Sequence, residues 1–311
     1  MSRGPLYEWM VNYTPQTEWV EGKGVMFCLA FFFIQLGAGM FFVSSIFRIL
    51  LGEFLGWLIC AVLGGGFHLL HLGHPMRFYR MVLRPQTSWV SRGLLFVVGF
   101  LILGGLQMVF SLCGISSLTL LIIANILAFL TVIYGGFAMN CINGIPFWNS
   151  ALLPILYAVA GFWGGAGLSM AVRLNSGVSP ETVLGVQELS RGLLVAFVVI
   201  FPTYLIAARY GLPAGKASVS EMVGRRLWPL FWILVVSLGL VLPIGVVIYS
   251  LVVGLEETPL ILLYLSIAFE LLGDLFLRYL ILKNGFYNPL VPAPAYYLSG
   301  RNLGNRGLNV N

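Results

Sequence analysis

Eight windows of roughly 20 mostly apolar residues, separated by short polar connections, constrain this chain more than any other feature. A bilayer core about 30 Å thick needs roughly 20 residues of helix to cross it, and a chain in lipid must satisfy its backbone hydrogen bonds internally. The pattern predicts an all-α integral membrane protein, an eight-helix transmembrane bundle with both termini on one side. The predicted spans are 24–47, 55–73, 93–113, 117–140, 149–172, 191–209, 228–250 and 259–281.

The composition excludes a water-soluble protein. Hydrophobic residues make up 59% of the 311 residues, charged residues only 9%, and the mean hydropathy is +0.95. We therefore expect the lipid bilayer as the surroundings and no nucleic acid as a partner. The N-terminus lacks the features of a cleaved signal peptide, so the first span is expected to stay in the mature protein. The expected organisation is an N-terminal membrane-surface segment (1–23), one transmembrane domain (24–281) and an extramembrane tail (282–311).

Small residues cluster inside the spans. The sequence Gly-Ala-Gly occurs at Gly37–Gly39 in the first span and again at Gly165–Gly167 in the fifth span. Close approach of helix backbones is the simplest interpretation. The recurrence in two blocks of four spans also raises the hypothesis that the chain consists of two related four-helix halves.

Basic residues near the span ends are distributed unevenly. With eight spans, 13 Lys and Arg side chains lie on the side of the termini, and three, Arg48, Arg173 and Arg191, lie on the other side. Because cytoplasmic loops carry the excess of positive charge, this count favours cytoplasmic termini. The alternative interpretation is that the basic face docks an acidic partner.

Three histidines, the only ones in the chain, follow one another near the end of the second span: His68, His71 and His74. Their spacing puts them on successive turns of one helix, so it does not give them a shared metal ion. His74 precedes Pro75, where a structural role at the helix end is the simpler interpretation. An ionisable side chain at membrane depth usually faces a cavity or a partner, which makes His68 and His71 candidates for a site.

Haem and iron–sulfur clusters are not expected in this chain. Two axial histidines normally come from different helices, and no other span contains a histidine. The four cysteines lie in separate apolar segments, without a C-x-x-C pair or a histidine spaced for zinc. The sequence therefore predicts no metal site.

The eighth span carries three charged residues at four-residue spacing: Glu270, Asp274 and Arg278. This spacing places them on one helix face. An ion pair between Asp274 and Arg278 would fasten the bundle and would leave Glu270 as a deeper acid without an obvious partner. Carboxylates stacked in a bundle interior also suit proton transfer.

The eight-span topology brings several polar and aromatic residues to the membrane face of the termini. An aromatic-rich site with a histidine, a tyrosine and nearby carboxylates offers what a quinone needs: hydrogen-bonding groups for two carbonyls, a proton route and apolar walls. The residues on this face include Trp19, Glu21, Lys23, His71, Arg77, Tyr134, Asn140, Asp274 and Arg278.

The stretch that leaves the second span resembles the polysulfide reductase membrane-subunit family, also called NrfD/PsrC, and more distantly the dimethyl sulfoxide reductase anchor subunit. The family signature is a histidine or aspartate with LG-x-P-x-R-F and then S-W-x-S-R-G, and this chain matches it from His71 to Phe78 and from Ser88 to Gly93. Gly-Ala-Gly in the first span and the stretches 145–157 and 270–282 agree as well. The dimethyl sulfoxide reductase anchor has a glutamate in place of Gly93, so the resemblance is closer to the NrfD/PsrC branch.

The resemblance implies a function. Such subunits hold eight or nine membrane helices and no haem, and they bind menaquinone or ubiquinone. They dock a four-cluster iron–sulfur protein that connects the quinone to a catalytic subunit, often a molybdopterin enzyme. By this resemblance the chain would be the quinone-reactive, multi-pass anchor of a respiratory complex in a prokaryotic plasma membrane, with coupled proton transfer. The family branch usually carries its site on the outer face, whereas the count of basic residues favours the inner face.

The resemblance also implies residue roles. His71 matches the family's ionisable residue beside the quinol, and Tyr134 matches the tyrosine that hydrogen-bonds a quinone carbonyl. In the leading mechanism, which the resemblance does not itself supply, Asp274 and Glu270 together with His71 would exchange the quinol's protons with one side of the membrane. At the start of the first span this chain has Glu21 and Lys23 and lacks the Asn and His of some relatives. The expected quinone contacts are Trp19, Glu21, His71, Arg77, Trp89 and Tyr134, and the expected docking residues are Arg77, Arg80 and Arg92.

Two alternatives remain open. A secondary transporter or proton channel would use the Glu270, Asp274 and Arg278 cluster, with Pro202 and Pro243 interrupting helices. The polar residues, however, gather toward one face rather than at the midplane. The chain could also be only an anchor whose quinone site lies in another subunit, and the presence of His71 and Tyr134 argues against this.

Overall fold

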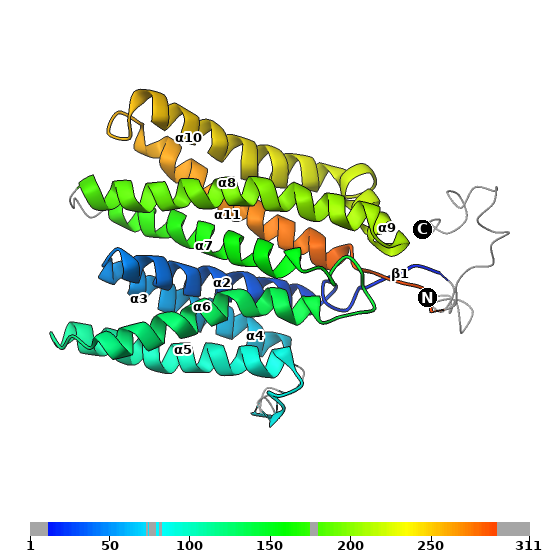
Figure 1. The fold of residues 1–311 in the computed structure, drawn as a ribbon, viewed down its shortest axis with the longest axis horizontal. Coiled ribbons are helices and arrows are strands. Elements are labelled where there is room, and N and C mark those ends of the chain that lie inside the picture. Colours follow the sequence, from blue (N-terminus) through cyan, green and yellow to red (C-terminus); the bar gives the residue numbers. More distant parts are fainter. Residues whose placement is uncertain (1–11, 73, 75–78, 81–82, 175–179, 291–311) are drawn as a thin grey trace.

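The computed structural model describes residues 12–72, 74, 79–80, 83–174 and 180–290, and it is built almost entirely of helices (Figure 1). Within this part of the chain, eight helical spans are long and apolar enough to cross a membrane. The predicted all-α bundle of eight spans is confirmed. The spans are Gly24–Ile46, Leu50–His71, Trp89–Leu112, Leu118–Asn140, Leu152–Leu174, Val183–Tyr210, Leu230–Val253 and Leu260–Lys283.

Most spans consist of one helix, and two are interrupted by π-helical segments. The single helices are α2 (Gly24–Ile46), α5 (Trp89–Leu112), α6 (Leu118–Asn140), α7 (Leu152–Leu174), α8 (Pro180–Tyr210) and α11 (Leu260–Lys283). The second span comprises α3 (Leu50–Leu58), η1 (Ile59–Gly64) and α4 (Gly65–His71). The seventh comprises η3 (Leu230–Val241) and α10 (Leu242–Val253).

Two helices begin five or more residues earlier than the sequence predicted. The second span begins at Leu50 instead of residue 55, and α8 begins at Pro180 instead of residue 191. The added turns contain polar residues, such as Glu53 and Gln187, that lower the hydropathy of a sequence window. Both of these side chains are buried in the bundle. The helices therefore continue through polar residues that a hydropathy window places outside the membrane.

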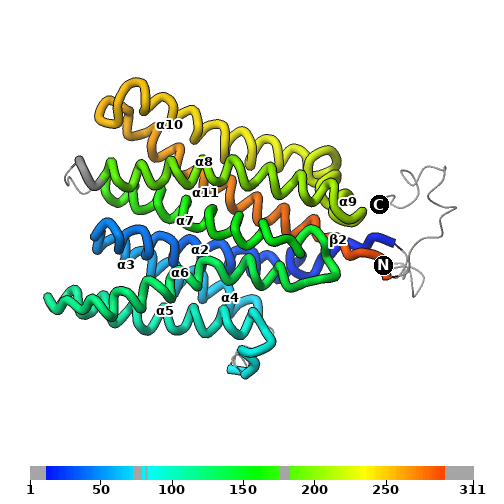
Figure 2. The backbone as a smooth tube through the Cα atoms, in the orientation of Figure 1, coloured from blue at the N-terminus to red at the C-terminus, as the bar shows by residue number. Residues whose placement is uncertain are grey.

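The central helices α2 and α7 lie side by side, and each begins a block of four spans (Figures 1 and 2). In the first block, α2 packs against the second span and against α6, and α5 packs against α6. In the second block, α7 packs against α8 and α11, and the seventh span packs against α11. The same arrangement therefore recurs in both blocks, as expected for two related four-helix halves.

The repeated Gly-Ala-Gly segments lie where the two halves meet. A Cβ atom on Gly39 would be 2.3 Å from the carbonyl oxygen of Gly161, and one on Gly165 would be 2.4 Å from the carbonyl carbon of Gly39. Any side chain at either position would push the two backbones apart. Close approach of α2 and α7 thus requires glycine here.

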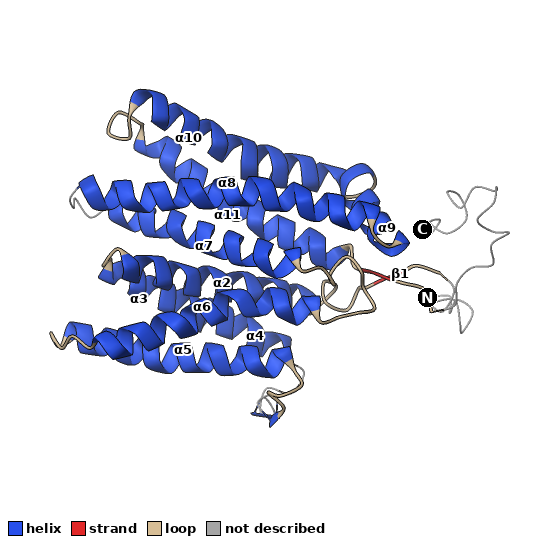
Figure 3. Ribbon diagram, viewed as in Figure 1, coloured by secondary structure: helices blue, strands red, loops and turns tan. Residues whose placement is uncertain are grey.

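The two described ends of the chain meet where α2 begins; we call this the N-terminal end of the bundle and the opposite end the far end. β1 (Thr14–Pro15) pairs antiparallel with β2 (Phe286–Tyr287) (Figure 3). A short helix that the sequence did not predict, α9 (Pro213–Gly224), contacts α8, η3 and β2. The predicted domain division at residues 23 and 281 stays a prediction.

Candidate functional site

An aromatic cluster lies at the N-terminal end between α2, α4 and α6. Phe27 is its centre, with ring centroids 4.8 Å from Trp19 and 5.1 Å from His71. Phe31 follows one turn later, 4.4 Å from Phe27 and 5.4 Å from Tyr134. Two phenylalanines of α2 therefore connect residues of three spans. The aromatic cluster consists of Trp19, Phe27, Phe31, His68, His71 and Tyr134.

His71 is the last residue of α4, half-buried against the start of α2. Its Nδ1 atom lies 3.1 Å from the backbone oxygen of Lys23. Because a carbonyl oxygen can only accept a hydrogen bond, Nδ1 carries the hydrogen and donates it. In the neutral ring Nε2 is then the acceptor. His71 therefore presents an acceptor nitrogen at the end of α4.

His68 lies one turn earlier on α4, with its ring centroid 6.1 Å from Phe27 and 6.3 Å from Phe31. Its Nδ1 atom is buried and has no hydrogen-bond partner among the described residues. A buried polar atom in this state costs free energy unless a ligand or water reaches it. α4 ends at His71, so His74 is exposed outside the helix and does not form the third turn that the spacing predicted.

Tyr134 lies on α6 with only 3% of its surface exposed. A Cβ atom on Gly93 would be 2.1 Å from Cδ2 of the Tyr134 ring. The ring therefore rests on the backbone of α5, at the glycine that ends the S-W-x-S-R-G motif. The Tyr134 hydroxyl makes no hydrogen bond with a described residue, and this leaves it free to donate to a ligand.

Trp89 and Arg92 shape the start of α5. The Trp89 ring stacks on Phe137 with centroids 4.5 Å apart, and the Arg92 guanidinium carbon lies 4.8 Å from the Trp89 centroid. Arg92 also donates from Nε to the Pro85 oxygen at 2.7 Å and from Nη2 to the Gln86 oxygen at 2.6 Å. Its guanidinium thus fastens the loop before α5, and a docking role would have to coexist with these contacts.

The other predicted contacts lie at the surface. Glu21 is exposed, and no described interaction joins its side chain to the aromatic cluster. The predicted role of Arg77 lies outside the described residues. Arg80 and Arg84 are exposed and line an open groove of about 640 Å³ at the N-terminal end. The remaining lining residues of the groove are Tyr79, Leu83, Ser88 and Ser91.

A charged network lies deeper, between α2, α7 and α11. Arg278 Nε donates to both carboxylate oxygens of Asp274, at 3.0 and 2.9 Å, which confirms the predicted ion pair. Arg278 Nη1 donates to Gln35 Oε1, and Gln35 Nε2 donates to the Val132 oxygen at 2.6 Å. The Arg278 guanidinium carbon also lies 4.6 Å from the ring centroid of Tyr157. We use the name charged network for Asp274, Arg278, Gln35 and Tyr157.

Gln35 is the connection between the network and the cluster. It lies one turn beyond Phe31 on α2, and both side chains pack on Gly135, where a Cβ atom would be 2.6 Å from Phe31 and 2.8 Å from Gln35. Among the described residues, no hydrogen bond, ion pair or ring contact joins Asp274 or Glu270 directly to the cluster. The structure thus separates the carboxylates from His71 and Tyr134.

Sequence reasoning missed the residues that hold the site together. Phe27, Phe31 and Gln35 recur every four residues and therefore share one face of α2. A glutamine within an otherwise apolar stretch was the available signal, because buried amides need partners. Among the described residues, no group of three or more His, Cys, Asp or Glu side chains is placed to hold a metal ion.

The fold and the site define a multi-pass helical membrane protein with a histidine- and tyrosine-containing aromatic site at one end of its bundle. Residues 23–289 match the family model described as "Polysulphide reductase, NrfD". The chain belongs to this NrfD family, which supplies membrane subunits of respiratory oxidoreductase complexes that work with iron–sulfur and catalytic subunits. The predicted resemblance to NrfD is confirmed over most of the chain.

A curated relative gives a partial match. Protein NrfD of Escherichia coli (strain K12) is 25% identical over 164 residues, which cover 51% of this chain and 50% of the relative. The chain thus spans about half the length of the curated relative it matches. That the chain is closer to the NrfD/PsrC branch than to the dimethyl sulfoxide reductase anchor subunit stays a prediction.

Proposed function

We propose that this chain is the quinone-reactive membrane subunit of a respiratory oxidoreductase complex in a prokaryotic plasma membrane. It would exchange electrons between the quinone pool, menaquinone or ubiquinone, and a docked iron–sulfur subunit that serves a catalytic, molybdopterin-type subunit. One observation carries the proposal. His71 borders Phe27 and Tyr134 borders Phe31, these two phenylalanines contact each other, and His71 and Tyr134 each have a hydrogen-bonding atom available.

The residues of the aromatic cluster fit a quinone head group. Phe27 and Phe31 provide flat apolar walls, and the Tyr134 hydroxyl and His71 Nε2 provide polar contacts. The buried His68 Nδ1 atom without a partner is a further polar group that a bound carbonyl or hydroxyl can satisfy. When bound, a quinone supplies two-electron, two-proton redox chemistry.

His71 is the residue we assign to proton exchange. It is half-buried at the end of α4, and its ring contacts Phe27 of the cluster. The Lys23 carbonyl orients the ring through Nδ1, which leaves Nε2 to accept or give up a proton. Tyr134 positions the ligand by donating its hydroxyl hydrogen. Asp274 is held by Arg278, so we do not assign it a quinone contact.

The partner surface in this proposal is the basic N-terminal end. Arg80 and Arg84 line the open groove there, and α9 with the turn after it adds further positive charge. An acidic face on the iron–sulfur subunit would complement these side chains. The described basic residues at this end are Lys23, Arg80, Arg84, Arg92, Arg209, Lys216, Arg225, Arg226 and Lys283.

Ligand binding tests the site directly. The purified full-length chain in lipid nanodiscs is titrated with a soluble menaquinone analogue, and quenching of tryptophan fluorescence reports binding near Trp19 and Trp89. Tyr134→Phe and His71→Ala should each weaken binding by about 3- to 10-fold, the effect of one hydrogen bond. Tyr157→Phe is the matched control, since this buried hydroxyl lies outside the cluster and has no partner among the described residues. If Tyr134→Phe and His71→Ala both bound the analogue with unchanged affinity, the proposed site would be wrong.

Electron transfer is tested in the complex. The tagged chain is purified in mild detergent with the subunits that accompany it, and a quinol analogue is added while the spectra of the iron–sulfur clusters are recorded. We expect the quinol analogue to reduce the iron–sulfur clusters of the accompanying subunit. A quinone-site inhibitor should block this reduction, and His71→Ala should slow it. A chain that binds the analogue but accompanies no iron–sulfur subunit would contradict the partner part of the proposal and leave the site part standing.

The alternative of a transporter or proton channel centred on Glu270, Asp274 and Arg278 receives less support from the geometry. Asp274 and Arg278 neutralise each other, and Arg278 is further held by Gln35 and by the ring of Tyr157. Charges engaged in this way fasten helices together. Glu270 is different, because it lies outside this pairing.

A further inference from the structure

A small cavity whose lining is mostly apolar but includes several polar side chains lies in the second half of the bundle, between α7, α8, α10 and α11. Its volume is about 40 Å³. This is separate from the aromatic cluster, which lies between α2, α4 and α6 in the first half. The polar side chains that line it are Gln187, Ser190, Arg191, Ser250, Ser266 and Glu270.

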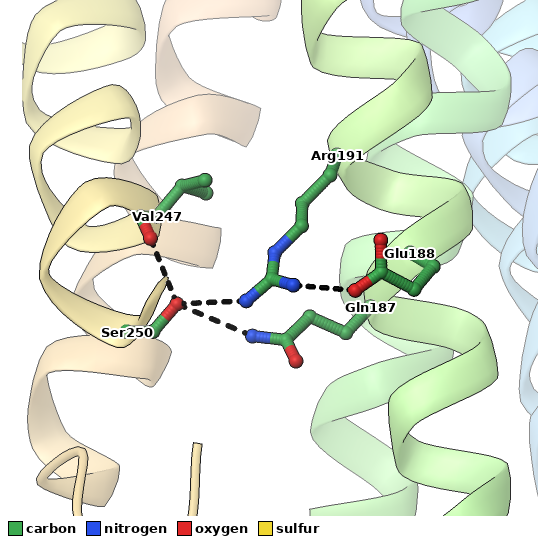
Figure 4. A network of polar contacts seen from close by, with 5 residues as sticks. All are labelled: Gln187, Glu188, Arg191, Val247 and Ser250. Atoms are coloured by element: carbon green, nitrogen blue, oxygen red, sulfur yellow. Dashed lines mark hydrogen bonds and ion pairs between the residues drawn. The ribbon is translucent and has the colours of Figure 1, made fainter. Parts of the chain in front are cut away.

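Ser250 organises one wall of this cavity (Figure 4). Its hydroxyl donates to the Val247 oxygen at 2.9 Å. The hydroxyl oxygen accepts from Gln187 Nε2 at 3.3 Å and from Arg191 Nη2 at 3.1 Å, so two side chains of α8 meet one side chain of α10. Arg191 also pairs with Glu188. Gln187 and Arg191 therefore both donate to the same oxygen atom, Oγ of Ser250.

Three buried polar atoms of the lining have no hydrogen-bond partner among the described residues: Gln187 Oε1, Arg191 Nε and Glu270 Oε1. Gln187 is 4% exposed and Glu270 is 5% exposed. Leaving such atoms unsatisfied costs free energy, because each has lost its hydrogen bonds to water. The cavity therefore calls for an occupant that can both donate to Gln187 and Glu270 and accept from Arg191.

Water meets this requirement. A water molecule needs roughly 10–15 Å³ of such volume and several polar partners, so the cavity has room for a few. The Arg191 guanidinium beside the acceptors disfavours a metal cation, and an apolar ligand could not satisfy the polar atoms. The lining thus favours a short chain of water molecules that ends at the Glu270 carboxyl.

The polar lining leads toward the far end. α8 begins at that end, and Glu188, the partner of Arg191, has 64% of its side chain exposed. In the other direction, Trp163 of α7 and Leu194 of α8 lie one turn nearer the N-terminal end and line the cavity with apolar surface. Water in the cavity is therefore connected more readily to the far end than to the aromatic cluster.

Glu270 is fixed at the inner end of this path. A Cβ atom on Gly167 would be 2.2 Å from Glu270 Oε1, so the carboxyl occupies the space that the glycine leaves on α7. Asp274, one turn further along the same helix, acts on it electrostatically and is itself paired with Arg278, and Arg191 of α8 lines the same cavity. The lining residues of α7 (Trp163, Gly167 and Met170) and of α10 (Pro243, Val246, Val247 and Ser250) are not titratable.

We propose that Glu270 is a proton-binding residue that exchanges its proton with the far end of the bundle through water held by Gln187, Arg191 and Ser250. The step transfers one proton and no electron: an O–H bond of a hydrated proton breaks and an O–H bond at the carboxylate forms. This site lies on the opposite side of the bundle from the proton exchange assigned to His71. It does not depend on quinone binding, so either proposal can fail while the other holds.

Infrared difference spectroscopy of the full-length chain in lipid vesicles tests the proposal. The carbonyl band of a protonated, buried carboxyl is identified as Glu270 by its loss in Glu270→Gln. After mixing with D2O, this band should shift rapidly in the wild type, and Gln187→Leu should slow the shift by about tenfold, because an apolar side chain removes a water contact. Glu53→Gln is the matched control, since Glu53 is a second buried carboxyl in another span. It should remove a different band and leave the exchange at Glu270 unchanged.

The direction of exchange needs vesicles that hold the chain in one known orientation. When the pH is changed on one side at a time, the Glu270 band should respond to the side of the far end. A response only to the side of the N-terminal end would overturn the proposal, as would equal exchange rates in Gln187→Leu and the wild type. If Glu270→Gln does not fold, the comparison between wild type and Gln187→Leu still decides the role of the water path.

Discussion

The aromatic cluster and the charged network lie one helical turn apart on α2. They differ in how many partners their polar side chains have within the protein. In the network, Arg278 is bound by Asp274, by Gln35 and by the ring of Tyr157. In the cluster, the Tyr134 hydroxyl and His68 Nδ1 have no hydrogen-bond partner among the described residues. The network pairs its charged groups and so stabilises the fold, although the Tyr157 hydroxyl has no described partner, whereas the cluster leaves hydrogen-bonding groups of two spans beside apolar rings, which suits a ligand.

The strongest test of this comparison breaks the ion pair. Asp274→Ala leaves the Arg278 guanidinium buried without its carboxylate, so we expect a loss of about 3–5 kcal/mol in the free energy of unfolding. Equilibrium unfolding in mixed micelles measures it. The double variant Asp274→Leu/Arg278→Met should recover most of the loss, because it removes both charges. Glu188→Ala, which breaks an exposed pair, should cost about 1 kcal/mol or less. A similar loss in Asp274→Ala and Glu188→Ala would show that the network is not the structural element we infer.

The contact between the halves gives the next largest effect. Gly165→Ala forces a Cβ atom to within 2.4 Å of the Gly39 carbonyl carbon, and we expect a loss of about 1–3 kcal/mol from overpacking. The same unfolding measurement applies. Gly66→Ala is the matched control, since no atom lies within 4 Å of the added Cβ there. If Gly165→Ala were as stable as the control, close contact of α2 and α7 would not hold the two halves together.

Gln35 sharpens the comparison because it touches both regions. Gln35→Leu removes an acceptor from Arg278 and a donor from the Val132 oxygen, and we expect a loss of about 1–2 kcal/mol. Because Phe31 and Gln35 pack on the same glycine, binding of the menaquinone analogue should weaken as well. Both effects are measured on one preparation, by unfolding and by fluorescence quenching. Weakened stability with unchanged binding would show that the two regions act independently.

The smallest effect on stability is expected at His71. His71→Ala removes one hydrogen bond from a half-buried side chain to the Lys23 carbonyl, which contributes about 0.5–1 kcal/mol. Quinol oxidation by the complex should nevertheless slow, since the proton acceptor is gone. Rates and unfolding are measured in parallel. A variant that loses stability as strongly as Asp274→Ala would place His71 among the structural residues.

Much of the fold follows from local properties of the sequence. Apolar length predicts each span, and an even number of spans puts both ends of the chain together. The four-residue spacing of Asp274 and Arg278 is enough to predict their ion pair, because one helix alone sets their separation. The motif after the second span predicts the NrfD family, which residues 23–289 confirm.

The tertiary structure decided which residues of different spans meet. Nothing in the sequence near Gly93 says that Tyr134 rests on it, and nothing near Gln187 says that α8 continues through polar residues to reach Ser250. Phe27, Phe31 and Gln35 link residues of different spans because of the way α2 packs against α4, α6 and α11, and the sequence of α2 alone does not show this packing. Hydropathy and periodicity describe one helix at a time, whereas contacts between helices depend on how their side chains pack.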